Sequence, residues 1–216
     1  IELCAPTGRA AKRMTEATGI EAQTIHRLLG ITYISGNKKR QIFIKDEENP
    51  IEADVIIVDE SSMIDILLMN SLLRAVAKRT RLILVGDVDQ LPSVGAGNVL
   101  KDIINSQCIK VIKLNQIFRQ ARESAIVMNA HRIIRGESPI LNEKESDFFF
   151  IKRYDIEEVN QAIIQLITQR LPKFLDTVDL KEMQVLCPMR KSPIGITNLN
   201  NILQEALNPP SEEKNE

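Results

Sequence analysis

Two adjacent carboxylates, Asp59 and Glu60, directly follow the β-branched run Val55–Val58. Such a run predicts a strand that is buried on both faces. An acid at the carboxyl end of a buried strand can hold Mg²⁺ through water, and its neighbour can polarise an attacking water molecule. The pair therefore indicates nucleotide hydrolysis. The alternative is that both acids only favour the N-terminus of the next helix.

A second apolar run ends in a similar way. Arg81–Val85 predicts a strand, Gly86-Asp87 follows it, and Gln90 comes three residues after Asp87. A Gln beside the γ-phosphate of a nucleotide can orient the attacking water and sense the phosphate. Taken alone, this Gly- and Pro-containing segment also fits a surface loop. The two strand-end motifs together are much harder to explain as an accident.

A third candidate site lies where the first predicted strand passes into a helix. The segment Ala5–Ala11 reads Ala-Pro-Thr-Gly-Arg-Ala-Ala. Backbone N–H groups at a helix start, together with Thr7 and Arg9, suit a phosphate of a nucleotide or nucleic acid. The alternative is that Thr7 is simply an N-cap.

The elements that must position these residues alternate between strands and helices, which predicts an α/β fold with a mostly parallel sheet. A second unit begins near residue 115, and the polar tail 209–216 is expected to be disordered. The predicted strands are 1–5, 55–58, 81–85, 109–114, 148–151 and 183–186. The predicted helices are 9–17, 23–29, one that follows Ser61 or Ser62, 99–105, 123–134, 156–171 and 194–207.

One stretch interrupts this alternation. Ile31–Ile34 and Gln41–Lys45 flank a polar segment that ends in Lys38, Lys39 and Arg40, which predicts a β-hairpin with a basic tip. The insertion runs from about residue 31 to 52. In the simplest reading it is a solvated surface hairpin.

Composition excludes several classes of protein. The 216 residues carry 28 Lys and Arg against 29 Asp and Glu, a balance that says little about partners. No apolar run approaches the roughly 20 residues of a membrane span, so an integral membrane protein is excluded. Three separated cysteines and two histidines argue against a disulfide framework or a Cys/His metal site. A reducing cytoplasm is the expected location.

The motifs, taken in order, closely resemble those of the RecD-like superfamily-one DNA helicases, the exodeoxyribonuclease V alpha subunit type. The resemblance covers residues 1–208 and is highly specific as a combination. The segments that carry it are Ala5–Ala11, Thr24–Leu29, Asp59–Met63, Gly86–Pro92, Phe118-Arg119 and Val185–Lys191.

The resemblance implies a RecA-like P-loop NTPase fold with parts of two tandem motor domains, residues 1–115 and 116–208. ATP would lie in the cleft between them. Asp59 would bind Mg²⁺, Glu60 would be the catalytic base and Gln90 the γ-phosphate sensor. Arg119 would reach the γ-phosphate from the second domain, and Phe118 would pack on the adenine.

The resemblance also implies partners in DNA recombination and repair. Single-stranded and fork DNA are expected, with 5′ to 3′ translocation, and further subunits of a helicase–nuclease complex are also expected. His26 could equally be a helix residue that packs on its own domain. The expected DNA-binding residues are Pro6, Thr7, Arg9, Thr24, His26, Lys38, Lys39, Arg40, Pro92 and Ser93.

Two departures from the family pattern affect these expectations. Relatives of opposite polarity place a base-stacking aromatic where Ser93-Val94-Gly95 stands, so DNA is expected to be held mainly through its phosphates. No GxxxxGK motif followed by Ser or Thr occurs, and the phosphate-binding Lys is expected upstream of Ile1. The chain is therefore read as an internal fragment that does not hydrolyse ATP by itself. The alternative is a noncatalytic DNA-binding or scaffold module with a RecA-like fold, although a scaffold would not need Asp59, Glu60, Gln90 and Arg119 together.

Overall fold

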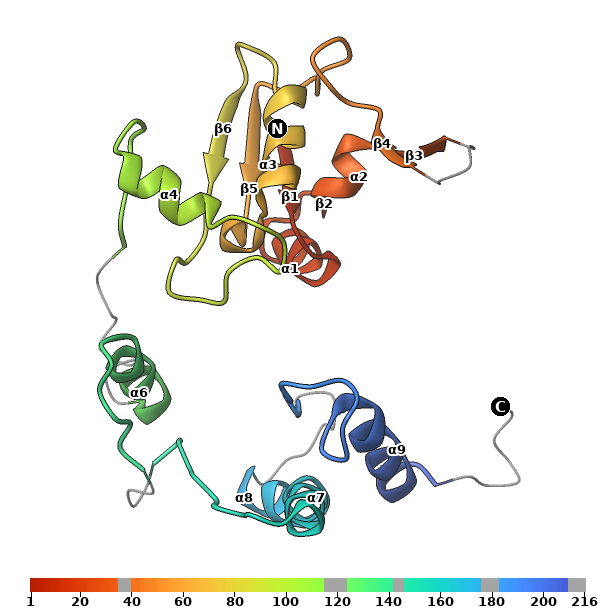
Figure 1. The fold of residues 1–216 in the computed structure, drawn as a ribbon, viewed down its shortest axis with the longest axis vertical. Helices are drawn as coiled ribbons and strands as arrows, with labels where there is room; N and C mark the ends of the chain where they lie inside the picture. The colour runs from red at the N-terminus through yellow and green to blue at the C-terminus, as the bar shows by residue number, and fades with distance from the viewer. Residues whose placement is uncertain (35–39, 115–123, 142–145, 176–182, 210–216) are drawn as a thin grey trace. The chain divides into compact units, whose positions relative to one another are not determined.

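Four parallel strands form the central sheet, in the order β2-β1-β5-β6 (Figure 1). β1 pairs with both β2 and β5, and β5 pairs with β6. This order confirms the mostly parallel sheet that strand–helix alternation predicts. The strands are β1 (Glu2–Ala5), β2 (Ala22–Thr24), β5 (Val55–Val58) and β6 (Arg81–Leu84).

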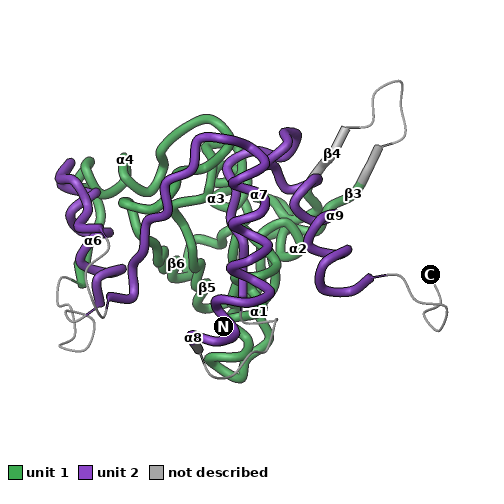
Figure 2. Tube along the Cα trace, turned by 90° about the horizontal axis from the view of Figure 1, so that it is seen from below, with its two compact units in different colours: residues 1–117 green, residues 118–216 purple. Residues whose placement is uncertain are grey.

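The computed structural model describes residues 1–34, 40–114, 124–141, 146–175 and 183–209. Contacts divide the chain into two units, Ile1–Ile117 and Phe118–Glu216, which Figure 2 draws in different colours. The interpretation of these units as parts of two motor domains stays a prediction. Among the described residues, none of the helices combines the length and the apolar composition that a membrane span needs.

The α-helices α1, α2 and α3 of the first unit each begin at a residue whose side chain caps the helix. Thr7 accepts a hydrogen bond from Ala10 N at 3.3 Å, Thr24 from Arg27 N at 3.2 Å, and Asp65 from Leu68 N at 2.8 Å. These side chains satisfy N–H groups that have no partner inside the helix. The helical elements are α1 (Gly8–Thr18), α2 (Ile25–Leu29), the 3₁₀ turn η1 (Ser61–Met63), α3 (Ile66–Ala75) and α4 (Val99–Ser106).

The core of the first unit lies between the sheet and the helices that cover it. Leu3, Cys4 and Ala5 of β1 are buried, and so is one face of α3. In β5, Ile56 and Val58 are buried but Val55 and Ile57 are only half-buried, so the prediction that this strand is buried on both faces is wrong: successive side chains alternate between the core and a partly open face. The buried cluster consists of Cys4, Ile25, Leu28, Leu29, Ile51, Ile56, Val58, Ile64, Met69, Leu72, Ala75 and Val99.

The predicted hairpin is present as an antiparallel pair, β3 (Ile31–Ile34) and β4 (Arg40–Phe43). Its register runs from Ile31 opposite Phe43 to Ile34 opposite Arg40. Lys38 and Lys39, at the predicted basic tip, lie outside the described residues.

The second unit is helical in its described part. The predicted helix 156–171 is found as three consecutive pieces, because a π-helical turn separates two α-helical segments. The elements are α6 (Ala125–Ile134), α7 (Ile156–Gln165), η2 (Leu166–Arg170), α8 (Leu171–Leu175) and α9 (Ile196–Leu207).

Three predicted strands are not formed. Ile109–Leu114, Phe148–Ile151 and Met183–Leu186 lie outside the helices and strands of the described chain. A short apolar run favours an extended backbone, but a strand also needs a neighbour that accepts and donates ladder hydrogen bonds. The predicted helix 23–29 is also corrected, because Ala22–Thr24 pairs with β1 and the helix begins at Ile25.

The second unit is held together in part by one buried amide. Asn129 on α6 is 2% exposed; its Nδ2 donates to Ile140 O and its Oδ1 accepts from Ile140 N, both at 2.8 Å. The side chain therefore closes a ring of two hydrogen bonds with the backbone of the loop that follows the helix. Satisfied buried amides of this kind are costly to remove.

We expect Asn129→Ala to lower the free energy of unfolding of the second unit by about 1–3 kcal/mol, because it leaves both Ile140 backbone groups unpaired. Denaturant unfolding followed by circular dichroism measures the change. Asn201→Ala, at an exposed position of α9, is the matched control and should leave the unfolding midpoint unchanged or slightly raised. Equal unfolding midpoints for Asn129→Ala and the native chain would contradict the stabilising role of the Asn129 side chain.

Candidate functional site

The segments that leave β1, β5 and β6 meet at one edge of the sheet, because neighbouring parallel strands end on the same side. Backbone hydrogen bonds continue beyond the strands themselves. Asp59 N donates to Cys4 O at 3.0 Å, and Val85 N donates to Val58 O at 2.8 Å. The edge therefore holds Thr7, Asp59 and Asp87 on one continuous backbone frame.

The two adjacent carboxylates lie at a sharp turn. Glu60 adopts φ 52° and ψ 39°, a left-handed conformation that few residues other than glycine adopt. Glu60 N donates to Asp59 Oδ1 at 2.8 Å, and Ser61 Oγ donates to Val58 O at 3.0 Å. Both acids are half-buried, while Ser61 is fully buried. An unfavourable backbone conformation held by its surroundings is a feature that clusters at functional sites.

Gly86 is the residue that allows β6 to approach this turn. A Cβ at position 86 would lie 2.9 Å from Leu100 Cδ2, 3.0 Å from Ser61 N and 3.1 Å from Ser62 N. Ser61 N also donates to Val85 O at 2.9 Å, so the backbone of the turn after β5 is in direct contact with the backbone at the end of β6. A side chain at position 86 would push the two strand ends apart.

Gln90 is oriented by the acid that precedes it. Its Nε2 donates to Asp87 Oδ2 at 3.2 Å, and Asp89 N donates to Asp87 Oδ1 at 2.9 Å. Gln90 N also donates to Asp87 O at 3.3 Å. In the sequence Asp87 stands out only as a strand-end acid, without this role. Its position three residues before Gln90, in a turn, is the signal that could have identified it.

The rest of this loop is folded against the start of α3. Ser93 Oγ lies 3.0 Å from both Gly95 O and Gly97 O, and Ile66 N donates to Ala96 O at 2.9 Å. A Cβ at Gly95 would lie 2.7 Å from Asp65 Cβ. Ser93 is therefore a loop-forming residue as well as a predicted DNA contact, and Pro92 beside it is exposed.

The predicted DNA contacts near β1 and β2 lie at two helix starts. Thr7 and Thr24 are both N-caps, which confirms the local role that the sequence analysis gave Thr7 as its alternative. Pro6 is half-buried and Arg9 is exposed. The His26 ring packs against the Phe43 ring with 5.8 Å between centroids and 53° between planes. His26 thus has a packing partner within its own unit.

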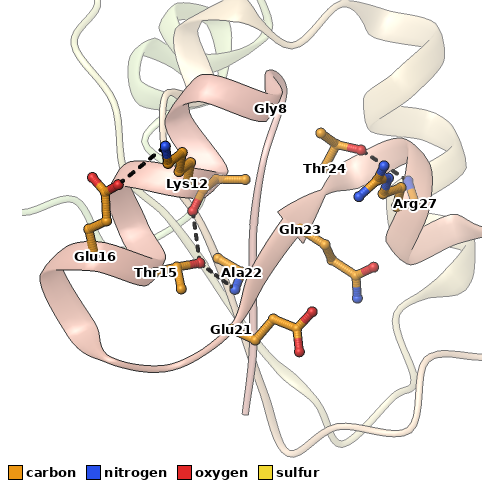
Figure 3. A pocket seen from close by; sticks show the side chains of 10 residues that line it. Gly8, Lys12, Thr15, Glu16, Glu21, Ala22, Gln23, Thr24 and Arg27 are labelled. Atoms are coloured by element: carbon orange, nitrogen blue, oxygen red, sulfur yellow. Dashed lines mark hydrogen bonds and ion pairs between the residues drawn. The ribbon is translucent and has the colours of Figure 1, made fainter.

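An open hollow of about 540 Å³ lies along α1 and β2 (Figure 3). In the wall of this hollow, Thr15 Oγ links α1 to β2: it donates to Ala11 O at 3.2 Å and accepts from Ala22 N at 2.9 Å. Lys12 and Glu16 form an exposed ion pair at its rim, with 3.7 Å between Nζ and Oε1. None of the strand-end acids lines this hollow, so it is separate from the candidate nucleotide site.

Several predicted site residues are not placed by this structure. Phe118, Arg119, Lys38 and Lys39 lie outside the described residues, and of Arg40 only the backbone, in β4, is described. Of the predicted catalytic and metal-binding residues, Asp59 and Glu60 lie at the turn after β5 and Gln90 lies in the loop after β6.

The donor set at the sheet edge fits Mg²⁺ in the manner of nucleotide-binding sites. The described residues contain no group of three or more His, Cys, Asp or Glu side chains that could hold a metal ion by themselves. Mg²⁺ commonly binds through one or two carboxylates together with water and substrate phosphates. Asp59 offers one such carboxylate directly after β5.

Comparison with known proteins gives matches over nearly the whole chain. A family described as an AAA domain matches residues 1–96. The ATP-dependent RecD2 DNA helicase of Deinococcus radiodurans is 39% identical over 209 residues, which is 97% of this chain and 27% of that protein. The RecBCD enzyme subunit RecD of Mycolicibacterium smegmatis is 32% identical over 240 residues, 96% of this chain and 41% of that subunit.

Among solved structures, the crystal structure of Bacteroides Pif1 bound to ssDNA aligns with 76% of this chain and 46% of that chain, at 19% identity and a TM-score of 0.40. The chain spans less than half the length of either curated relative. The parallel sheet and the AAA-domain match confirm the α/β, RecA-like fold class. The matches also confirm the resemblance that the motifs predict: along nearly its whole length, this chain is similar to the RecD-like DNA helicases.

Proposed function

We propose that the protein containing this chain is an ATP-dependent DNA helicase, which couples ATP hydrolysis to 5′ to 3′ movement on single-stranded DNA and to duplex unwinding. The observation that carries the proposal is the close approach of the β5 and β6 ends. This approach supports the proposal, because Asp59 and Glu60 follow β5 and the Gln90 loop follows β6, at the edge where open α/β sheets bind ligands.

Each residue at this edge has a chemical task in the proposal. Bound Mg²⁺ would neutralise charge on the ATP phosphates, and Asp59 would hold the ion through water. Glu60 would accept the proton of the attacking water molecule. Gln90, oriented by Asp87, would contact the γ-phosphate.

The DNA would lie along the other half of the same edge. Thr7 and Thr24 use an oxygen lone pair to cap a helix, and a hydroxyl keeps its proton to donate to a phosphate. Pro6 and Arg9, which neighbour Thr7 in the sequence, and Pro92 and Ser93, in the loop after β6, are also proposed to contact the DNA. Contacts of this kind to the DNA backbone carry no information about the base sequence.

The β3–β4 hairpin is proposed as a wedge at the fork, with Lys38, Lys39 and Arg40 near DNA phosphates. Single-stranded DNA and fork DNA are thus the proposed partners. Because relatives include a subunit of a RecBCD enzyme, partner subunits are proposed as well. The proposed site of action is the cytoplasm.

We expect Glu60→Gln in the full-length protein to lower DNA-stimulated ATP turnover by about 10²–10⁴-fold, because Gln cannot accept the proton from water. Affinity for single-stranded DNA should persist. A coupled ATPase assay and fluorescence anisotropy measure the two quantities. The matched control is Glu52→Gln, an exposed acid that precedes β5. Native turnover in Glu60→Gln would remove Glu60 from the reaction.

Arg119→Ala should lower kcat by about 10³–10⁵-fold while ATP affinity changes little, because a guanidinium at the γ-phosphate acts mainly on the transition state. Arg119→Lys should not restore turnover, since a point charge lacks the planar fork. Steady-state kinetics and nucleotide binding measure these effects. The contrary result is near-native turnover in Arg119→Ala, which would leave Arg119 as a surface residue.

Deletion of residues 36–40, the tip of the hairpin, should spare ATPase stimulated by single-stranded DNA but impair unwinding of a forked duplex. The physical reason is that the deletion removes the wedge and leaves the sheet edge intact. Strand-displacement and ATPase assays on the full-length protein compare the two activities. If both activities fall together, the hairpin serves folding instead.

A further inference from the structure

The hairpin leaves helix α2 through one glycine. Gly30 has φ +65°, and its N–H donates to Arg27 O at 3.0 Å. A Cβ at this position would lie 3.3 Å from Ile44 Cβ and Cδ1, on the segment that returns from the hairpin. The exit therefore requires both a left-handed backbone and a residue without a side chain.

The returning segment is bonded to the end of the same helix. Ile44 N lies 3.1 Å from Leu29 O and 2.8 Å from Gly30 O, and Lys45 N donates to Leu29 O at 2.9 Å. Leu29 is fully buried in the core of the unit. Both strands of the hairpin are thus anchored at the C-terminal end of α2.

Phe43 adds a side-chain contact to this backbone anchor. It is the last residue of β4, it pairs with Ile31 of β3, and it packs against the buried core cluster. Its ring also meets that of His26 on α2, at a centroid distance of 5.8 Å. One aromatic side chain therefore contacts the helix, the core and the base of the ladder.

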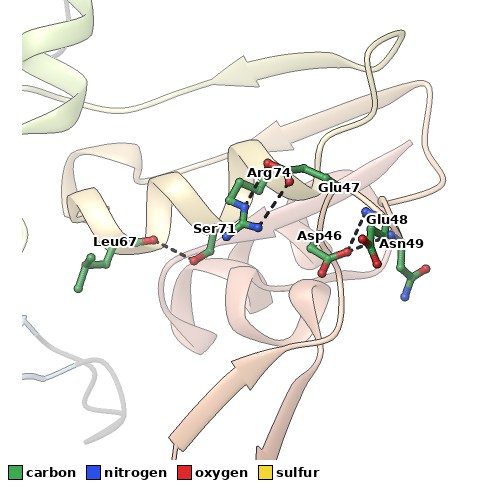
Figure 4. A network of polar contacts seen from close by, with 7 residues as sticks. All are labelled: Asp46, Glu47, Glu48, Asn49, Leu67, Ser71 and Arg74. Atoms are coloured by element: carbon green, nitrogen blue, oxygen red, sulfur yellow. Dashed lines mark hydrogen bonds and ion pairs between the residues drawn. The ribbon is translucent and has the colours of Figure 1, made fainter.

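The loop after the hairpin contributes much less. It folds on itself, because Asp46 Oδ1 accepts from Glu48 N and Asn49 N at 3.0 Å each (Figure 4). Its link to α3 is the ion pair between Arg74 Nε and Glu47 Oε1 at 3.2 Å, with side chains 54% and 66% exposed. An exposed pair of this kind contributes little to stability. The hairpin base is thus fixed mainly through α2.

We propose that Phe43, braced by the His26 ring, is a positioning residue that sets the angle between the β3–β4 hairpin and helix α2. The inference rests on the proposed role of the hairpin in unwinding. Thr24, the N-cap of α2, lies at the edge proposed to hold DNA, so α2 connects that edge to the hairpin. His26 acts in this scheme through its ring rather than by contact with a phosphate.

In the full-length protein, Phe43→Ala should lower the unwinding rate by about three- to tenfold, the range expected when an aromatic pair is lost. ATPase stimulated by single-stranded DNA should stay unchanged and shows that the variant is folded. Phe43→Tyr, which keeps the ring, should restore unwinding. Thr32→Ala, at an exposed position of β3, is the matched control and should unwind as the native protein does.

Variants of His26 separate a ring contact from a DNA contact. His26→Phe keeps a ring opposite Phe43 but has no hydrogen-bonding nitrogen, so unwinding and single-strand affinity should be retained. His26→Ala should lower unwinding as Phe43→Ala does, and the double variant should be no worse than either single variant. Reduced single-strand affinity in His26→Phe would overturn the positioning role.

A distance measurement on the 216-residue chain tests, without DNA or ATP, whether Phe43 fixes the angle between the hairpin and α2 (the hinge angle). Cys108 and Cys187 are first changed to Ser. Spin labels at Thr32→Cys and Arg13→Cys then report the distance between the hairpin and α1. Cys4 escapes labelling, because burial, and to a lesser degree the nearby Glu2 charge, raise the pKa of its thiol to about 12. Phe43→Ala should broaden the distance distribution, and Phe43→Tyr should not.

The outcomes distinguish this inference from the proposed function. An unchanged distance distribution in Phe43→Ala would overturn the inference, whatever the helicase activity. Suppose that the distribution broadens but the native full-length protein neither hydrolyses ATP nor unwinds DNA. The positioning role of Phe43 would then stand, and the proposed function would be refuted. A broadened distribution with native unwinding in Phe43→Ala would refute the link between hinge angle and duplex separation.

Discussion

The contact between the end of β6 and the turn after β5 is the constraint on which the candidate nucleotide site depends. Ser61 N bonds to Val85 O at 2.9 Å, and there is no room for a Cβ at Gly86. The acids come from one strand and the Gln loop from the next, so any separation of these two ends would disperse the site. The pairing of β5 with β6 holds the two ends in register over four residues.

Elements that depend on a local pattern could be predicted from the sequence, and those that depend on a distant partner could not. The runs Val55–Val58 and Arg81–Leu84 and the N-cap Thr7 are each readable over a few residues. The strand predicted at Ile109–Leu114 failed, because a short apolar run does not specify a ladder neighbour. Nor does any local signal reveal the contact of His26 with Phe43, which are seventeen positions apart.

The candidate site also has features that the sequence predicts and features that it does not. The carboxylates and the glutamine could be chosen from their spacing after two strands, but the left-handed turn at Glu60 could not, because glutamate has no preference for it. That turn matters chemically. Successive side chains of a straight strand point to opposite faces. A turn at Glu60 ends this alternation, while Asp59 Oδ1 is held by the Glu60 N–H. Two neighbouring acids can then take different tasks.

The order of the strands separates the residues proposed for the nucleotide from the threonines proposed for DNA. β5 and β6 carry the acids and the Gln loop, whereas β1 and β2 lead into the two threonine-capped helices. Neighbouring strands lie about 5 Å apart, so the two halves of the edge are separated by about 10 Å and share ladder hydrogen bonds. Asp59 N bonds directly to Cys4 O in the adjacent strand. Paired backbone therefore links the strands that carry the acids to the strands that lead into the threonine-capped helices.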